Sequence, residues 1–368
     1  VPVLGLMVSS IPGIELSGPL TAVPVINTAL LIKELFLGHP GLAQTYVFVF
    51  VSTCLYAAAA IALAVRIFSR EEVLFQSQAS LRLFLNRRYF RPLAAPKAGD
   101  ALLTLALVFP AWFYIAMQPS RAMAEGQPLT SSALVLNILL TLVLPFLLLP
   151  LAAAWYLKAD LKHTFLWRRP APRHLLAGAC LGGSAWLLVL QGLAWQSLFW
   201  PLPAQQDGLE ALKNLPIWSV VALLALGPAL CEEHFFRGFL LSGLRQDRAG
   251  GRFWAIVLSG LVFSAFHFPL FRQPSVALLG FALGYLAWES RSLWPGVLFH
   301  LLVNGLMFTV AERVMPADYG KLGGTLPSPP PIYVAAAAVV FGLGLWLARA
   351  PKTETSEPFG TSAAQSTG

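Results

Sequence analysis

The sequence predicts an all-α polytopic membrane protein with about nine transmembrane helices. The chain has 368 residues, of which 57% are hydrophobic and only 11% are charged, and its mean hydropathy is +0.68. A soluble domain carries about 25% charged residues. Apolar stretches of about 20 residues, the length that crosses a bilayer core as a helix, recur along the chain. This composition excludes an ordinary soluble protein, and its many apolar residues exclude a disordered one.

The apolar stretches define nine expected spans in order. They cover residues 44–68, 100–118, 132–157, 174–199, 216–241, 253–271, 274–289, 292–311 and 332–349. The earlier apolar segment 18–37 contains two prolines, a lysine and a glutamate, so we expect an interfacial or re-entrant element there. The tail 350–368 has no apolar face, and we expect it to be disordered.

Loop charges predict the orientation of these spans. The chain carries 25 Lys and Arg against 17 Asp and Glu, a net charge of +8. Basic residues concentrate in 69–98, 158–173 and 242–252, whereas the intervening loops carry one basic residue each. Basic loops face the cytoplasm, so we expect a multi-pass membrane protein with these three segments on the cytoplasmic side. The same placement favours the lipid bilayer as partner over nucleic acid.

The glycines and cysteines say less about function than the charged residues do. GxxxG spacings at Gly178/Gly182 and Gly280/Gly284 predict close helix packing in lipid. The three cysteines, Cys54, Cys180 and Cys231, form no close pair, so neither a disulfide framework nor a cysteine zinc site is expected.

Polar residues inside the apolar spans identify a candidate site, because an ionisable group at mid-membrane is costly unless it is paired or solvated. They are Glu232, Glu233 and Arg237 in 216–241, His267 in 253–271, and His300 and Asn304 in 292–311. With His234, which follows Glu233 in the chain, three of the six histidines accompany the only well-embedded carboxylates. Such a set suffices for water activation and oxyanion stabilisation, as amide hydrolysis requires.

Helical geometry divides these residues between two roles. Glu233 and Arg237 are four residues apart and share a helix face, so we expect an ion pair. Glu232 points about 100° away from Glu233 and is free to meet His267. Neighbouring His234 faces elsewhere, and we expect it to be structural or interfacial. The expected boundaries place Glu232 roughly 24 Å from the outer end of its helix, which is near the cytoplasmic side of the membrane. They place His267 roughly 21 Å from the cytoplasmic end of the next helix, so the expected depths of the two residues in the membrane disagree.

These residues resemble three motifs of one protease family. Glu232-Glu233-x-x-x-Arg237, Phe263-x-x-x-His267 and His300-x-x-x-Asn304 are similar to the motifs of the CAAX prenyl protease and bacteriocin-processing (CPBP, or Abi) family of intramembrane glutamic endopeptidases. The motif region covers 216–311. The family's eight-helix core would extend over 99–349, in agreement with eight of the expected spans.

The resemblance implies a role for each residue. Glu232 would be the general base and would activate water together with His267, while His300 and Asn304 would stabilise the oxyanion. Glu233 and Arg237 would support the active-site helix. No cofactor or metal is implied, and the substrate would be a membrane-associated protein or peptide.

Residues 1–98 require a separate interpretation. The stretch 9–38 with its following span resembles the C-terminal end of ABC-type sodium-extrusion permeases. This resemblance implies the C-terminal part of a permease–protease fusion, joined by a basic cytoplasmic linker, with a separate ABC ATPase subunit as partner. A simple membrane anchor is the alternative for this segment.

Three other functions remain open at this point. Glu232, His267 and His300 are enough ligands for a catalytic zinc ion, although the sequence contains no H-E-x-x-H. A non-catalytic permease or immunity-type subunit would keep the same cluster for structural reasons. A proton-coupled transporter would also use an intramembrane Glu/His chain.

Overall fold

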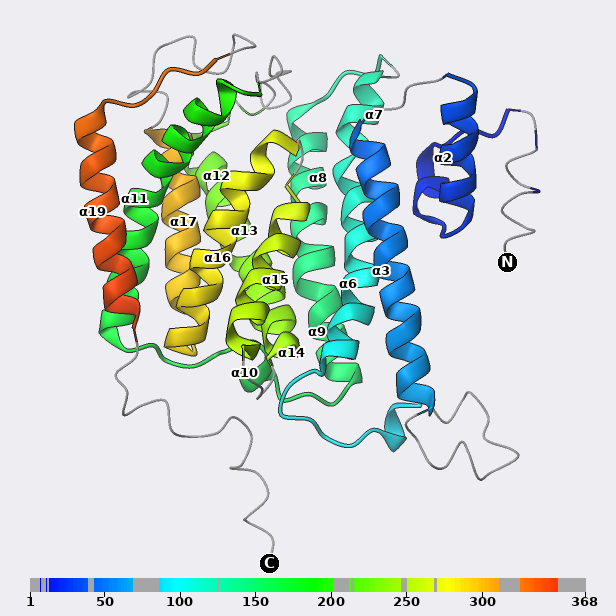
Figure 1. Ribbon diagram of the computed structural model, residues 1–368, viewed down its shortest axis with the longest axis horizontal. Helices are drawn as coiled ribbons and strands as arrows, with labels where there is room; N and C mark the ends of the chain where they lie inside the picture. The colour runs from blue at the N-terminus through cyan, green and yellow to red at the C-terminus, as the bar shows by residue number, and fades with distance from the viewer. Residues whose placement is uncertain are drawn as a thin grey trace, which may run out of the picture.

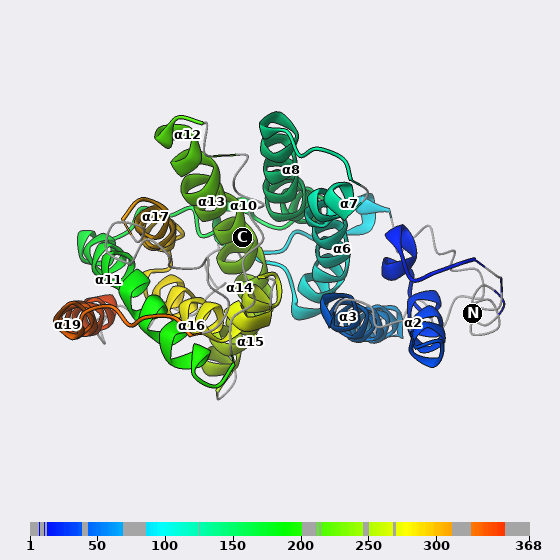
Figure 2. The ribbon, with the colours of Figure 1, turned by 90° about the horizontal axis from the view of Figure 1, so that it is seen from above.

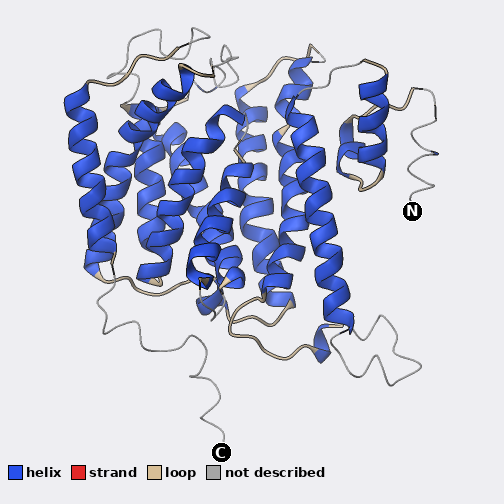
Figure 3. Cartoon of the chain, viewed as in Figure 1, coloured by secondary structure: helices blue, strands red, loops and turns tan. Residues whose placement is uncertain are grey.

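The computed structural model describes residues 7, 11, 13–38, 43–68, 86–124, 126–200, 212, 215–245, 250–267, 270–310 and 325–349. Helices dominate this part of the chain, and it contains no named strand, only an isolated bridge between Leu93 and Ala159 (Figure 3). The predicted fold class is confirmed: the protein is an all-α polytopic membrane protein.

The first four membrane-length stretches run alternately down and up through the bundle (Figure 1). They are α3 (Ala43–Phe68); α6 (Ala98–Ala116), continued by α7 (Gln118–Ala124); α8 (Ser131–Val143), η3 (Leu144–Leu148) and α9 (Leu149–Tyr156); and α11 (Pro172–Ser197). Short α10 (Leu161–Thr164) and η2 (Arg87–Tyr89) lie in the connections. These helices place both described basic segments of this half, 86–97 and 157–171, at the lower end of the view.

The second half contains the candidate site. Its elements are α12 (Ile217–Val221), η5 (Ala222–Leu226), α13 (Gly227–Glu233), η6 (His234–Leu240), α14 (Leu241–Leu244), α15 (Gly251–Ala265), η7 (Leu270–Arg272), α16 (Gln273–Ser290), α17 (Trp294–Thr309) and α19 (Pro331–Ala348). The elements from α12 to α14 form one continuous 28-residue stretch, Ile217–Leu244. In the described part of the chain, seven stretches are long and apolar enough to cross a membrane, and α15 and α17 are shorter apolar helices.

Two of the predicted spans are longer than the helices that the structure contains, α15 and α17. The span predicted at 253–271 ends at Ala265. The span predicted at 292–311 begins at Trp294 and ends at Thr309. The tail 350–368 lies outside the described residues.

The segment predicted at 18–37 forms η1 (Gly18–Ala22) and α2 (Ile26–Phe36). The 11 residues of α2 are too few to cross a bilayer. Viewed from above, α2 and α3 lie at one edge of the bundle and α19 lies at the other (Figure 2). Phe48 of α3 stacks on Phe113 of α6 with ring centroids 3.7 Å apart, so α3 packs directly on the neighbouring helix.

Glycines set the close helix contacts that the GxxxG spacings predict. A Cβ at Gly178 or Gly182 would lie 2.5 Å from the carbonyl oxygen of Pro295 or Phe299, so α11 packs against the backbone of α17. A Cβ at Gly280 would lie 2.8 Å from the Cα of Gly260, which brings α16 equally close to α15. These contacts draw together the helices that surround the candidate site.

Candidate active site

The helix that carries the glutamates is irregular on both sides of them. The π-helical segments η5 and η6 flank α13, and π segments inside α-helices occur frequently at functional sites. Pro228 has no N–H to donate to the carbonyl of Leu224, four residues earlier. The side-chain Nδ2 of Asn304 donates to that carbonyl at 3.2 Å, so a proline in one helix creates the partner for an amide in another.

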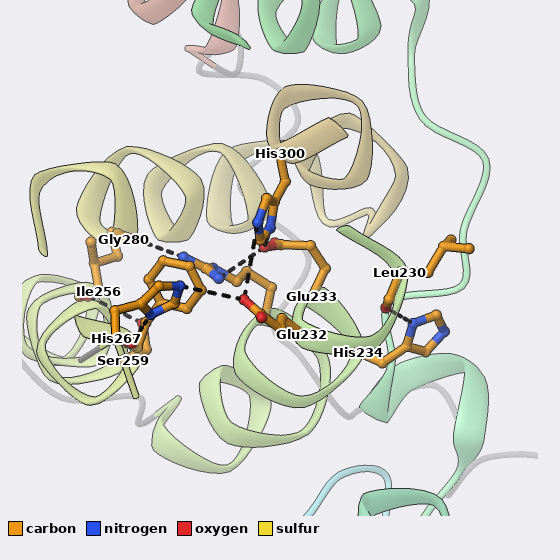
Figure 4. A network of polar contacts seen from close by, with 11 residues as sticks. Leu230, Glu232, Glu233, His234, Ile256, Ser259, His267, Gly280 and His300 are labelled. Atoms are coloured by element: carbon orange, nitrogen blue, oxygen red, sulfur yellow. Dashed lines mark hydrogen bonds and ion pairs between the residues drawn. The ribbon is translucent and has the colours of Figure 1, made fainter. Parts of the chain in front are cut away.

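A charged network fixes Glu233 at the centre of the bundle. Its Oε1 accepts hydrogen bonds from NH1 of Arg237 and from Nδ1 of His300, both at 2.9 Å (Figure 4). Glu233 is fully buried and Arg237 is 1% exposed. The predicted i,i+4 ion pair is confirmed, whereas the bond between Glu233 and His300 joins two motifs in a way that the sequence did not indicate.

The guanidinium of Arg237 has partners beyond Glu233. It lies over the ring of Phe263, 4.2 Å from the centroid, and its NH2 donates to the carbonyl of Gly280 at 3.4 Å. The charge of Arg237 is therefore shared by a carboxylate, a carbonyl and an aromatic face. These contacts tie the glutamate helix to α15 and α16.

Glu232 points away from this ion pair and toward two imidazoles. Its Oε2 lies 3.9 Å from Nε2 of His267 and 4.0 Å from Nε2 of His300 (Figure 4). That oxygen is buried and has no hydrogen-bond partner in the described part of the chain. Separations of this size between polar atoms are suited to a bridging water.

The ring of His267 is oriented by the backbone of its own helix. Nδ1 lies 2.9 Å from the carbonyl of Phe263, which only accepts hydrogen bonds, so Nδ1 carries the proton. In the neutral ring Nε2 is then an acceptor that faces Glu232. His267 lies two residues beyond the end of α15 at Ala265, and its Nε2 lies 3.9 Å from Oε2 of Glu232. The difference in depth expected from the sequence therefore does not separate the two side chains.

A small cavity of about 80 Å³ adjoins these groups. It is lined by His267, His300 and Asn304 together with apolar side chains, among them Phe263 and Leu283. A polar cavity needs roughly 10–15 Å³ to hold one water, so this volume accommodates water beside the imidazoles. His267, His300 and Asn304 thus line one hollow, and Oε2 of Glu232, which is not among its lining residues, faces the two imidazoles.

Comparison with known proteins supports the motif assignment. Residues 214–306 match the family model of Rce1-like proteins, described as type II CAAX prenyl endopeptidase Rce1-like. Residues 214–306 form an Rce1-like region. The matched residues include Glu232, Glu233, Arg237, His267, His300 and Asn304. No curated protein and no solved structure gives a significant match to the chain.

The Rce1-like match does not extend to residues 1–98. The permease resemblance of that segment, its basic linker and the proposed boundary of the protease domain at 99–349 stay predictions. Among the described residues, the span within 1–98 packs on α6 through Phe48.

His234 in the Rce1-like region is structural, as expected. Its Nδ1 lies 2.7 Å from the carbonyl of Leu230, so Nδ1 carries the proton and Nε2 accepts from Nε1–H of Trp167 at 2.9 Å. Sequence analysis gave no reason to single out Trp167, because indole side chains near span ends are usually interfacial anchors.

The segment around Trp167 connects two helices of the site. Ser242 donates to the carbonyl of Thr164 at 2.9 Å, and the N–H of Leu293 donates to the carbonyl of Leu166 at 3.0 Å. The segment thereby contacts both the glutamate helix and the start of the helix that carries His300.

Metal ligation was the main chemical alternative for these residues. In the part of the chain that the structure describes, no group of three or more His, Cys, Asp or Glu side chains has an arrangement that would hold a metal ion. Zinc ligation by Glu232, His267 and His300 stays a prediction.

Proposed function

We propose that this protein is an intramembrane endopeptidase of the CAAX prenyl protease type, which hydrolyses a peptide bond with water activated by Glu232 and His267. The observation that carries the proposal is the buried Oε2 of Glu232, which faces two imidazole nitrogens at 3.9 and 4.0 Å. The Rce1-like match over residues 214–306 supports it independently.

Water activation is assigned to the pair Glu232 and His267. A water between Oε2 of Glu232 and Nε2 of His267 would donate one proton to each. Glu232 takes a proton as the water oxygen attacks the scissile carbonyl carbon, and His267 orients the attack. Nε2 of His267 is available for this because Nδ1 is engaged by the carbonyl of Phe263.

Oxyanion stabilisation is assigned to His300 and Asn304. The carboxylate of Glu233 accepts from Nδ1 of His300, and in the imidazolium form Nε2 donates as well. One N–H of the Asn304 amide is used by Leu224, which leaves the second to donate to the oxyanion. When the tetrahedral intermediate collapses, the C–N bond breaks and Glu232 returns its proton to the leaving amine.

Glu233 and Arg237 support this chemistry without contact with the reacting atoms. Their ion pair is buried among helices that contribute every other site residue. Removal of either partner would leave an uncompensated charge and disturb the orientation of His300.

The substrate we propose is a membrane-associated protein or peptide that reaches the site from the face with the basic loops. The protein would act as a multi-pass component of the bacterial cytoplasmic membrane. A separate ABC ATPase remains the partner suggested by residues 1–98. Nothing in the proposed reaction requires a cofactor.

The test is cleavage of a fluorogenic CAAX-type peptide, prenylated or unmodified, by purified full-length protein in proteoliposomes. Glu232→Gln removes the general base at constant size, so we expect kcat to fall about 10²–10⁴-fold. Glu15→Gln, an exposed carboxylate near the N-terminus, is the matched control and should keep wild-type activity. Undiminished cleavage by Glu232→Gln would contradict the proposal.

The same assay separates this mechanism from zinc catalysis. Activity should survive exhaustive treatment with a chelator, because the proposed reaction uses only protein side chains. Loss of cleavage on chelation, restored by added zinc, would instead assign Glu232, His267 and His300 as metal ligands.

A further inference from the structure

A second, much larger hollow lies on another side of α16. It is a groove of about 670 Å³ between α11, α15, α16 and α19. Its walls are almost entirely apolar, with Leu188, Ile256 and Phe341 as representative side chains. The volume falls within the range of about 300–1,000 Å³ that is usual for small-molecule sites.

The polar groups of this groove are unevenly distributed along it. In Figure 1, α15 begins and α16 ends at the bundle end that carries the basic loops. Arg252 lies in the first turn of α15 and Tyr285 in the last two turns of α16, whereas Ser275 lies in the first turn of α16, toward the opposite end. From Ser275 to Tyr285 the groove follows α16 for roughly 15 Å. The long apolar part therefore extends from a charged end into the bundle.

Arg252 retains capacity for an anionic partner. It pairs with Glu289 through NH2, and its guanidinium lies 5.4 Å from the centroid of the Tyr285 ring. The side chain is nevertheless 49% exposed. A guanidinium has five N–H donors in a planar fork that matches phosphate. The pair with Glu289, the one ion pair of Arg252 among the described residues, leaves donors for a second anion.

The groove opens toward lipid. Phe253 and Leu278, two of its lining residues, are 61% and 67% exposed. Trp254, next to Arg252 in the chain, is 54% exposed, as expected for an aromatic anchor at the membrane interface.

We propose that this groove binds a glycerophospholipid of the leaflet on the basic-loop side, with an acyl chain in the apolar part and the phosphate on Arg252. The polarity of the groove decides the leaflet. Lipid headgroups lie at the membrane surface and their chains point to the midplane, which matches a charged end at the basic loops. A lipid of the opposite leaflet would place its chains toward Arg252.

Other occupants fit the groove less well. An extended peptide would bring backbone N–H and C=O groups against apolar walls that offer them few partners. A membrane-spanning helix would need about 30 Å of groove, whereas this groove follows α16 for roughly 15 Å. A flexible hydrocarbon chain has neither requirement.

The bound chain would pack against the back of the candidate active site. Leu279 lines both the groove and the small cavity beside His267 and His300. The adjacent Gly280 accepts a hydrogen bond from Arg237. The lipid site nevertheless stands on its own observations and does not depend on the proposed peptidase activity.

Native mass spectrometry of the purified full-length protein with added palmitoyl-oleoyl phosphatidylglycerol tests the proposal. We expect one lipid to bind more tightly than the rest. Arg252→Gln should weaken that lipid about tenfold, because a charge-assisted contact to phosphate is lost. Gly192→Leu should abolish binding by filling the groove; a Cβ at Gly192 meets only Ser275 Oγ, at 3.6 Å, so the helix itself tolerates the side chain.

Matched controls distinguish this site from general lipid adhesion. Arg88→Gln removes an exposed charge at the same membrane face, and Leu107→Phe enlarges an exposed side chain on α6. Both should bind lipid as the wild type does. Dioleoylglycerol, which lacks phosphate, should bind to the wild type more weakly than phosphatidylglycerol does. The two lipids should bind equally well to Arg252→Gln.

Several results would overturn the proposal. Unchanged lipid binding in both Arg252→Gln and Gly192→Leu would show that lipid lies elsewhere. If the wild-type protein binds no phospholipid molecule more tightly than the other bound lipids, the groove is not a specific lipid site. A dimer that Gly192→Leu dissociates would assign the groove to a second copy of the chain.

Discussion

Two polar regions of this bundle lie among apolar helices, and they differ in charge and in the satisfaction of their hydrogen bonds. In the charged network around Glu233, the buried oxygens Oε2 of Glu232 and of Glu233 lack hydrogen-bond partners within the described residues. In the neutral seam between α2 and α3, Asn27 donates to Thr21 and Ser52, and Tyr56 donates to the carbonyl of Ala22. A satisfied neutral seam joins helices, whereas a charged network with unpaired oxygens is equipped for chemistry.

The largest expected effect on stability comes from breaking the charged network. Arg237→Met leaves the carboxylate of Glu233 buried without its main counter-charge, which should cost about 3–5 kcal/mol of unfolding free energy. Unfolding in mixed micelles measures this. The double variant Glu233→Gln/Arg237→Met removes both charges and should recover much of the loss. A single variant as stable as the wild type would show that the ion pair does not hold the site together.

A smaller effect is expected where α15 and α16 meet behind the network. A Cβ at Gly260 would lie 2.4 Å from Cδ1 of Phe281. Gly260→Ala should therefore cost about 1–3 kcal/mol and reduce peptide cleavage, because it displaces the helix that presents Gly280 to Arg237. Gly342→Ala is the control, since nothing lies within 4 Å of its Cβ position. Equal behaviour of the two variants would argue against the close contact.

Loss of a hydrogen bond in the neutral seam between α2 and α3 should destabilise the protein less than Arg237→Met or Gly260→Ala. Asn27→Leu removes buried hydrogen bonds to Thr21 and Ser52, and such bonds between membrane helices average about 0.6 kcal/mol. We expect a loss of that size in mixed-micelle unfolding and wild-type cleavage of the peptide. A marked loss of cleavage would mean that the seam contributes to the active site after all.

The smallest effect concerns an ionisable group outside the spans. Asp160 caps α10, and the hydrogen bond from the backbone N–H of His163 lowers the pKa of its carboxyl below the ordinary value of 3.8. A lowered pKa stabilises the fold above the unfolded-state pKa, and this contribution disappears as the pH falls through the lower folded-state value. The wild type should therefore lose slightly more stability below about pH 4 than Asp160→Asn. Parallel pH profiles of unfolding would contradict this.

Much of the fold and of the candidate site was accessible from the sequence. Hydropathy and loop charge indicated the spans and their alternation, because bilayer thickness fixes helix length. The i,i+4 spacing predicted the contact of Glu233 with Arg237, because both residues lie on one helix. The divergence of Glu232 from Glu233 toward His267 followed from the same geometry.

Contacts between helices were less accessible. The bond from His300 to Glu233 and the bond from Asn304 to Leu224 depend on how helices rotate against each other. Pro228 does signal a free carbonyl at Leu224, but not which side chain reaches it. The groove beside Arg252 arises from four helices, and no local pattern in the sequence describes such a space.

The central claim is that Glu232 and His267 act together on one water molecule. A double-mutant cycle of kcat with Glu232→Gln and His267→Gln tests it most directly, because groups that act as a unit are strongly non-additive. We predict that the double variant cleaves the peptide hardly more slowly than Glu232→Gln alone. Losses that multiply would show that the two side chains act independently and would contradict the account.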